Sequence, residues 1–137
     1  MFELHADLVN GTTEVARLPL CRVQLLNDKT YPWLVLVPAK PGLKDFHDVA
    51  ASDQLTLMQE IDLASRALVS LYNPDKMNVA ALGNMTPQLH IHVIARYKTD
   101  RAWPGPVWGV VPAVKYSDAE LAETIGQIKA ALDKLAT

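Results

Sequence analysis

The chain has 137 residues, of which half are hydrophobic and a fifth are charged, as in an ordinary globular domain. Its formal net charge of −2 excludes the broad basic field that holds polymeric nucleic acid by its phosphates. The single cysteine, Cys21, excludes an intrachain disulfide and a cysteine-rich zinc site, which favours a reducing compartment. The first ten residues lack the features of a signal peptide, and no apolar stretch approaches the roughly 20 residues that span a bilayer. We therefore expect a cytoplasmic protein without a membrane partner.

Two strands and a long helix are predicted in the first half of the chain. Residues 21–26 form a partly alternating run that ends at Asn27-Asp28, a pair that favours turns. Branched and aromatic residues fill positions 33–37, which precede a proline and have the character of a central strand. A helix is predicted over 52–72, with Ser52 as its N-terminal cap and Asn73-Pro74 at its end. Its apolar residues follow the spacing of one helix face: Leu57, Ile61, Ala64, Leu68 and Leu71.

The second half of the chain predicts a hairpin, an irregular arm and a closing helix. The hairpin pairs strands at 77–82 and 88–95 across a loop at 83–87. The arm at 101–112 holds three prolines and two glycines, so regular structure is not expected there. Ser117 and Glu120 have the spacing of a capping box, which predicts a helix over 117–136. Its apolar face is formed by Leu121, Ile125, Ile128, Leu132 and Leu135.

The order of these elements indicates the α+β class, because strands precede and follow one long helix. No internal repeat, low-complexity tract or linker divides the sequence. The whole chain, 1–137, is therefore predicted to be a single domain. Its core covers about residues 15–97, and the arm at 101–112 and the helix at 117–136 complete it.

The predicted strand at 88–95 carries two of the four histidines in the chain. A strand period of two places Gln88, His90 and His92 on one face and the apolar residues between them on the other, so one face is polar and the other belongs to the core. Histidine exchanges protons near neutral pH and acts as a nitrogen nucleophile. The pattern alone leaves two further interpretations open, a solvent-exposed strand face that happens to carry histidines and one half of a metal site. Further metal ligands would have to come from His5, His47, Cys21 or carboxylates, none of which lies at a recognisable spacing.

Residues 88–94 resemble the signature of the histidine-triad (HIT) superfamily, His-φ-His-φ-His-φ-φ with φ apolar, except that Gln88 replaces the first histidine. The resemblance extends over about residues 15–97. Residues 23–38 are similar to the family's first core hairpin, although Trp33 stands where many relatives carry a histidine. The resemblance implies a mostly antiparallel sheet of about five strands, one long helix packed on it, and a C-terminal helix. It also implies a homodimer whose sheets join, for which the apolar face of the long helix offers an interface.

The resemblance also implies roles for individual residues. His90 would be the nucleophile and would form a covalent nucleotidyl-histidine intermediate. His92 would bind the phosphate oxygens, where a positive charge on its ring would stabilise the transition state. Gln88 still forms hydrogen bonds but carries no proton to give to a leaving group at neutral pH. The ribose hydroxyls would be held by Asn27, with Asp28 as the second choice.

The residues around the motif suggest further contacts. Asn84, in the loop before the motif, is placed to donate its amide to a phosphate, and Thr86 offers a hydroxyl, although Asn84 is equally typical of a hairpin turn. Three basic residues after the motif either attract a polyphosphate tail or form solvated surface: Arg96, Lys98 and Arg101. Trp103 and Trp108 either stack on a base or pack against protein, and packing or an interface is the preferred interpretation.

The leading functional hypothesis is hydrolysis or transfer of a nucleoside monophosphate from a dinucleoside polyphosphate or a nucleoside phosphoramidate. The expected partner is a small purine-type nucleotide, and the scheme needs neither a metal nor a cofactor. An alternative is a nucleotide-binding module whose catalysis was weakened when the first histidine became Gln88. A third hypothesis, ranked last, is a metal-binding protein that uses His90 and His92.

Overall fold

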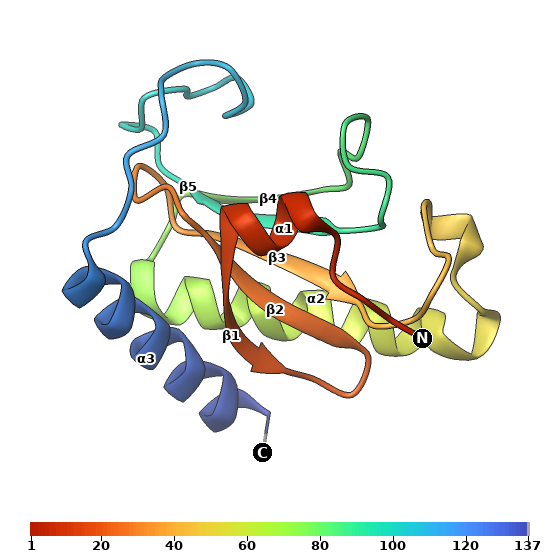
Figure 1. The fold of residues 1–137 in the computed structure, drawn as a ribbon. Coiled ribbons are helices and arrows are strands. Elements are labelled where there is room, and N and C mark those ends of the chain that lie inside the picture. The colour runs from red at the N-terminus through yellow and green to blue at the C-terminus, as the bar shows by residue number, and fades with distance from the viewer. Residues whose placement is uncertain (137) are drawn as a thin grey trace.

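The computed structural model of the chain describes residues 1–136 and contains one five-stranded antiparallel sheet (Figure 1). The strand order is β1-β2-β3-β5-β4, with every neighbouring pair antiparallel. The strands are β1 (Thr12–Arg17), β2 (Cys21–Leu26), β3 (Trp33–Pro38), β4 (Lys76–Ala80) and β5 (Ile91–Arg96). The predicted α+β class and the number of strands are confirmed, and so is the antiparallel pairing of the last two strands.

Two helices cover one face of the sheet, α2 (Ala51–Tyr72) and α3 (Asp118–Leu135) (Figure 1). The apolar stripe of α2 packs against β3 and β5, which bury alternate residues on this side. The main core therefore lies between the sheet and the two helices. Its fully buried members include Val23, Leu25, Leu34, Leu36, Ala64, Leu68, Ile91, Val93 and Ile128.

The opposite face of the sheet is covered by the short helix α1 (Ala6–Gly11) and by the irregular arm. A second apolar cluster lies there, formed by Leu8, Tyr31, Trp33, Val35, Val37, Ile94 and Val107. Because both faces are covered, every residue of β3 and β5 is buried. The face that carries His92 is therefore buried as well, and the interpretation of a solvent-exposed strand face is wrong.

The predicted start of α3 and the predicted end of α2 are confirmed. The capping box of α3 is present in both directions, since the Ser117 hydroxyl accepts from the Glu120 amide and the Glu120 carboxylate accepts from the Ser117 amide. Asn73 ends α2 in the left-handed conformation, with φ of 45°. The predicted cap at Ser52 is wrong, because α2 begins one residue earlier and Ser52 lies within its first turn. The capping position is Ala50, whose side chain has no acceptor.

The sequence predictions missed elements near the N-terminus and extended the hairpin strands too far. Helix α1 is a single short segment, and β1 is an edge strand whose half-exposed residues show no clear alternation. A short 3-10 helix, η1 (Phe46–Asp48), was also not predicted. The last two strands are shorter than predicted at the loop between them, since β4 ends at Ala80 and β5 begins only at Ile91. Gln88 and His90 therefore lie in the loop rather than in the strand.

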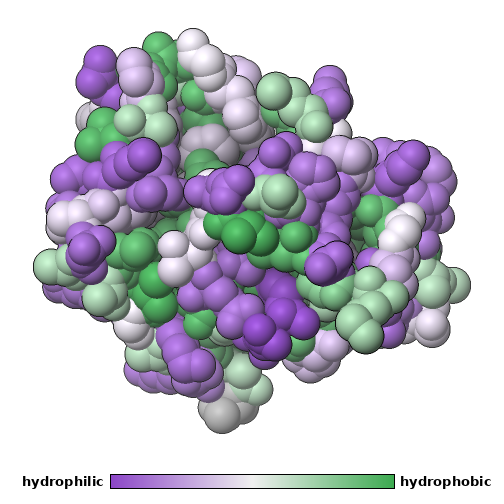
Figure 2. Space-filling model, in the orientation of Figure 1, coloured by the Kyte–Doolittle hydropathy of each residue, from purple (hydrophilic) through white to green (hydrophobic). Residues whose placement is uncertain are grey.

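The described surface mixes hydrophobic and hydrophilic residues. In the orientation of Figure 2, hydrophobic residues form small patches that are bounded by hydrophilic ones. Among residues 1–136, no helix is both long enough and apolar enough to cross a membrane.

Candidate active site

His90 lies at the end of the β4–β5 loop, immediately before β5. The Leu89 amide donates to the Leu43 carbonyl at 3.0 Å, which fixes this end of the loop to the segment that follows β3. The His90 ring meets the His92 ring at a centroid distance of 5.0 Å with an interplanar angle of 76°. The two histidines of the motif are therefore neighbours, although they do not share one strand.

The orientation of the His90 ring is set by the backbone of its own loop. Its Nδ1 atom lies 2.7 Å from the Gln88 carbonyl oxygen, which only accepts hydrogen bonds. Nδ1 therefore carries the proton, and the neutral ring keeps its lone pair on Nε2. This tautomer is the one required of a nitrogen nucleophile that attacks through Nε2.

His92 is held by the opposite kind of contact. The indole Nε1–H of Trp33 donates to His92 Nδ1 at 3.0 Å, so the neutral His92 ring carries its proton on Nε2. Burial, together with the neighbouring His90, lowers the pKa of His92 from its usual 6.5 to about 4. The positive charge expected of His92 is therefore wrong at neutral pH, and the ring is a neutral hydrogen-bond donor.

Aromatic rings surround His92 on the sheet face opposite α2. Trp33 and Trp108 contact it with centroid distances of 5.7 and 5.1 Å, and they contact one another at 5.7 Å. Trp108 reaches this position because the arm folds back over β5. The preferred interpretation, that Trp108 packs against protein, agrees with these contacts.

Arg96 holds the arm in place and is not part of a basic surface. It is 1% exposed, and its guanidinium pairs with the Asp100 carboxylate at 2.7 and 3.1 Å. It also donates to Asn78 Oδ1 and to the Gly105 carbonyl, and it lies 5.8 Å from the centre of the Trp103 ring. The suggestion that Arg96 attracts a polyphosphate tail is therefore wrong, because no donor of this buried side chain faces solvent.

The side chain of Gln88 contacts the N-terminal segment of the chain. Its Oε1 accepts from the His5 amide and its Nε2 donates to the Glu3 carbonyl, both at 2.8 Å. Thr86 makes a parallel contact, since its hydroxyl donates to Asp7 Oδ2 at 2.8 Å. Both side chains thus bind protein groups in this structure, which leaves their expected contacts with a substrate as predictions.

A cavity of about 250 Å³ lies beside His90. Gly83 is required at its edge, because a Cβ there would lie 2.8 Å from the Thr86 carbonyl oxygen. Asn84 is exposed and lines the same cavity, close to where the sequence suggested a phosphate contact. The remaining wall includes Lys44, Asp45, Gln88 and Leu89.

Asn27 and Asp28 line a second cavity of about 360 Å³, together with Trp33 and Trp108. The Asn27 Oδ1 atom accepts from the Tyr116 amide at 3.0 Å. Asp28 is buried, and its Oδ1 accepts from the amides of Thr30 and Val114. Both residues therefore fix the segment before α3, and Asp28 is poorly available to a ligand.

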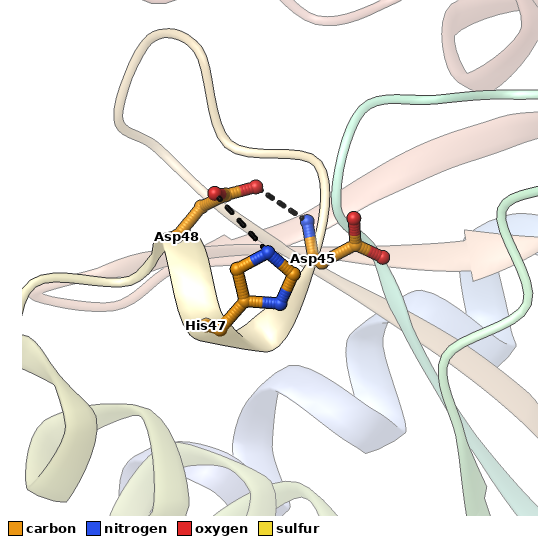
Figure 3. Close-up of side chains that lie close together, drawn as sticks. All are labelled: Asp45, His47 and Asp48. Atoms are coloured by element: carbon orange, nitrogen blue, oxygen red, sulfur yellow. Dashed lines mark hydrogen bonds and ion pairs between the residues drawn. The ribbon is translucent and has the colours of Figure 1, made fainter.

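One group of potential metal ligands is found among residues 1–136, and it contains neither His90 nor His92. It consists of His47 and Asp48 on the exposed 3-10 helix η1 and of Asp45, the N-cap residue before it (Figure 3). The Asp48 carboxylate already accepts from the Asp45 amide at 3.0 Å and lies 3.7 Å from the His47 ring. The group therefore fits a capped turn.

The fold and the His90–His92 pair at the start of β5 together define the architecture of a histidine-triad protein. The HIT domain model matches residues 8–99, and the chain belongs to this family. A histidine triad protein from Marinobacter aquaeolei is 43% identical, with a TM-score of 0.94 and 98% of both chains covered. One from Bradyrhizobium japonicum is 41% identical, with a TM-score of 0.92 and coverage of 96% of this chain and 98% of that one. One from Sinorhizobium meliloti is 36% identical, with a TM-score of 0.92 and coverage of 95% and 96%. A comparison with curated proteins gave no match.

Three groups that contact the motif residues were not predicted from the sequence. Trp33 was noted only as a departure from the family pattern, yet its indole fixes the His92 tautomer. Trp108 covers His92, and the backbone of residues 3–5 binds Gln88. No local pattern indicates these contacts, because they join segments between 16 and 85 residues apart.

Proposed function

We propose that the protein is a nucleotide hydrolase or nucleotidyl transferase that acts at the α-phosphate through a covalent intermediate on His90. The observation that carries this proposal is the His90 ring, whose Nδ1 is bonded to the Gln88 carbonyl and which lines a cavity. In its neutral form, an imidazole fixed in this way presents the lone pair of Nε2 to the cavity.

In the proposed reaction, Nε2 of His90 attacks the α-phosphorus and displaces the leaving group. The nucleotidyl-histidine is then resolved by water or by another acceptor. Neutral His92 offers its Nε2–H to a phosphoryl oxygen in exchange for the Leu82 backbone, with which this ring bonds in the structure, and Asn84 offers an amide from the loop. The His92 ring is held before the reaction by the Trp33 indole, so it stabilises the developing charge with little reorganisation.

The second cavity is the proposed site of the nucleoside. Its two indole rings, Trp33 and Trp108, provide aromatic surface for a base of the purine type. Asn27 is the proposed contact to the ribose, in preference to Asp28, which is buried and already accepts two amides. Trp33 contacts His92 and His92 contacts His90, so a series of ring contacts joins the wall of the second cavity to the nucleophile.

The alternative is a nucleotide-binding module with weakened catalysis. One observation favours it, namely that the side chain at the first motif position is occupied by the N-terminal segment. Turnover of a dinucleoside polyphosphate or an adenosine phosphoramidate, measured beside nucleotide binding by calorimetry, separates the two functions. We expect wild-type turnover that His90→Asn abolishes while binding persists. Nucleotide binding by the wild type without any turnover would establish the binding module and contradict the enzyme.

We also propose that the protein is a homodimer formed through β4 and the groove beside it. β4 is an edge strand, and unpaired strand edges are available for pairing with another chain. The groove between α2 and β4 is largely apolar, with Met58 62% and Val79 46% exposed. It overlaps only partly with the interface suggested by the sequence, because the apolar stripe of α2 is largely buried in the core and only its residues Leu57 and Ile61 also line the groove. Its apolar lining consists of Phe46, Val49, Leu57, Met58, Ile61 and Val79.

A further inference from the structure

The N-terminal segment, residues 2–8, is anchored on the sheet face opposite α2 and lies along the loop that carries the nucleophile (Figure 1). Leu8 is 6% exposed within the second apolar cluster, and Phe2 and Leu4 pack against the same cluster. The Arg22 guanidinium on β2 lies 5.3 Å from the centre of the Phe2 ring. The segment is therefore a fixed part of the fold that can support the loop beside it.

Gln88 joins this segment to the nucleophile through its side chain and its main chain. Its side-chain Oε1 accepts from the His5 amide and its Nε2 donates to the Glu3 carbonyl, both at 2.8 Å. Its main-chain carbonyl oxygen lies 2.7 Å from Nδ1 of His90. Both polar atoms of the side chain are bonded to the anchored segment, so they hold the main chain of the same residue in place. Three hydrogen bonds of one residue therefore lead from the N-terminal backbone to the ring of the nucleophile.

The carbonyl of Gln88 controls the tautomer of His90. It can only accept a hydrogen bond, so Nδ1 keeps the proton and Nε2 keeps the lone pair while this contact persists. A Cβ at position 83 would lie 3.7 Å from Cε1 of His90, the ring atom between the two nitrogens, so this edge of the ring lies beside the loop. If the carbonyl turned away, the ring could exchange to the tautomer with its proton on Nε2. That tautomer has no lone pair on Nε2 with which to attack phosphorus.

We propose that Gln88 is a positioning residue for His90, which fixes the nucleophile by tying its loop to the N-terminal segment. Glutamine suits this role because one planar amide offers both a donor and an acceptor, which match the Glu3 carbonyl and the His5 amide. The first motif position thus acts through the backbone and not on the substrate. This inference rests on the proposed function, since it concerns the same nucleophile, but the tautomer of the ring can be measured without any substrate.

Gln88→Met tests the proposal, because methionine has a similar length and makes neither of the two hydrogen bonds. Nitrogen NMR of the imidazole rings at pH 9, without nucleotide, should show His90 as the Nδ1–H tautomer in the wild type and as a mixture of both tautomers in the variant. With an adenosine phosphoramidate, we expect kcat to fall by about 10 to 10²-fold and KM to change by less than about threefold. The matched control is Gln127→Met on α3, where the amide donates to Glu123 of the same helix, and it should change neither the tautomer nor the rate.

Two substitutions at His5 test the segment itself. The backbone at His5 has φ of −57°, which proline adopts, so His5→Pro removes the N–H that Gln88 accepts without a change of φ. His5→Ala keeps this N–H, and both variants lose the ring and its hydrogen bond to the Asp7 amide. We expect His5→Pro to give the same tautomer mixture and loss of kcat as Gln88→Met, and His5→Ala to lose much less. The double variant of Gln88→Met and His5→Pro should be no slower than Gln88→Met alone.

The possible outcomes separate the role of Gln88 from the proposed function. A His90 ring that keeps the Nδ1–H tautomer in Gln88→Met, or an unchanged kcat, would overturn the positioning role. A higher KM with an unchanged kcat would instead show that Gln88 binds the substrate directly. Equal losses in His5→Pro and His5→Ala would overturn the part played by the segment amide. A wild type without turnover would contradict the proposed function, and the NMR comparison would still decide the role of Gln88.

Discussion

At the residue scale, the hydrogen bond from Trp33 favours the neutral form of His92 and fixes its tautomer. Its indole N–H occupies Nδ1 of His92, and protonation of that nitrogen would break the hydrogen bond. Burial and His90 act in the same direction, so the pKa of His92 falls to about 4. A neutral donor next to the nucleophile therefore replaces the positively charged ring that the motif alone suggests.

Trp33→Phe should raise the pKa of His92, because it removes the donor and leaves the ring packing largely intact. Nitrogen NMR of the imidazole rings during a pH titration measures this directly. In the wild type we expect His92 to remain the neutral Nε2–H form at pH 6 and to titrate near 4. A wild-type His92 that titrates at about 6.5 or above would contradict this assignment.

The same lowered pKa should make the fold less stable in mild acid. A histidine with a lower pKa in the folded state binds fewer protons there than when unfolded, so protonation favours unfolding. The stability that neutral His92 provides is complete above pH 6.5 and is lost progressively as the pH falls toward 4. The difference between these pKa values corresponds to roughly 3 kcal/mol. Urea unfolding of wild type and His92→Asn across pH 7 to 4 should show that the free energy of unfolding falls more steeply with decreasing pH in the wild type. Equal slopes for the two proteins would contradict the role of the His92 pKa.

At the level of single residues, the motif predicted the neighbouring histidines but not the contacts of Gln88. The motif identified His90 and His92 correctly as neighbours, and the structure brings Asn84 to the same cavity as His90. The motif could not show that Gln88 binds Glu3 and His5, since that pairing depends on where the N-terminal segment folds. Gln88→His appears from the motif to restore a proton donor. In the structure this substitution would also remove the amide that binds Glu3 and His5.

At the scale of elements, buried polar contacts join α2 to the start of β2. The Glu60 carboxylate on α2 accepts from the amides of Leu20 and Cys21 at 2.9 and 2.7 Å. Glu60 is 5% exposed, so these two amides have no access to water as a substitute partner. The helix is thereby fixed to the turn between β1 and β2.

Glu60→Ala should destabilise the fold by about 2–5 kcal/mol, because it leaves two buried N–H groups without an acceptor. Glu60→Gln retains one amide oxygen and should lose less. Chemical denaturation of the two variants measures the difference. Near-equal free energies of unfolding for Glu60→Ala and the wild type would show that the carboxylate does not stabilise this junction.

The arm depends on a second buried contact, between Arg96 and Asp100. Asp100 accepts from the guanidinium and from three backbone amides, which lowers its pKa to about 2. Asp100→Asn should cost about 3–5 kcal/mol, because it leaves the buried Arg96 without its counter-charge. The stability given by the carboxylate is present above its usual pKa of 3.8 and lost as the pH falls toward 2. Thermal melts of Asp100→Asn and wild type at pH 5 and pH 2.5 should therefore converge at the lower pH, and a constant difference would contradict this.

Elements with strong periodicity were predicted well, and elements defined by tertiary contacts were not. The apolar periodicity of α2 and the capping box of α3 are local signals, and both helices appear where they were expected. β1 lies at the edge of the sheet and has only Val15 buried, so its sequence carries little pattern. The start of β5 was placed too early because alternation continues through Gln88 and Leu89, although the loop is fixed there by Leu43.

At the scale of the whole molecule, the edge of β4 and the groove beside it are the surfaces that we propose to bind a second copy of the chain. The sheet is covered on both faces by its own chain. The groove beside β4 therefore offers the apolar surface for a second copy, and its exposed residues lie outside the core.

Met58→Asp should convert the proposed dimer to a monomer, because it places a charge in the apolar groove. Light scattering after size-exclusion chromatography measures the mass of each species. Val9→Asp is the matched control, since Val9 is 55% exposed on α1, on the other side of the sheet. A monomeric wild type, or a Met58→Asp variant that remains dimeric, would contradict the proposed interface.

The proposed function depends above all on His90 becoming covalently bound to a nucleotide during turnover. Rapid mixing with an adenosine phosphoramidate, quenching in denaturant at alkaline pH and mass spectrometry of the peptide that contains residues 88–96 test it directly. We predict an added nucleoside monophosphoryl group on His90, formed at the rate of the first half-reaction and absent from His90→Asn. Turnover by the wild type without this adduct, or an adduct on another residue, would contradict the claim.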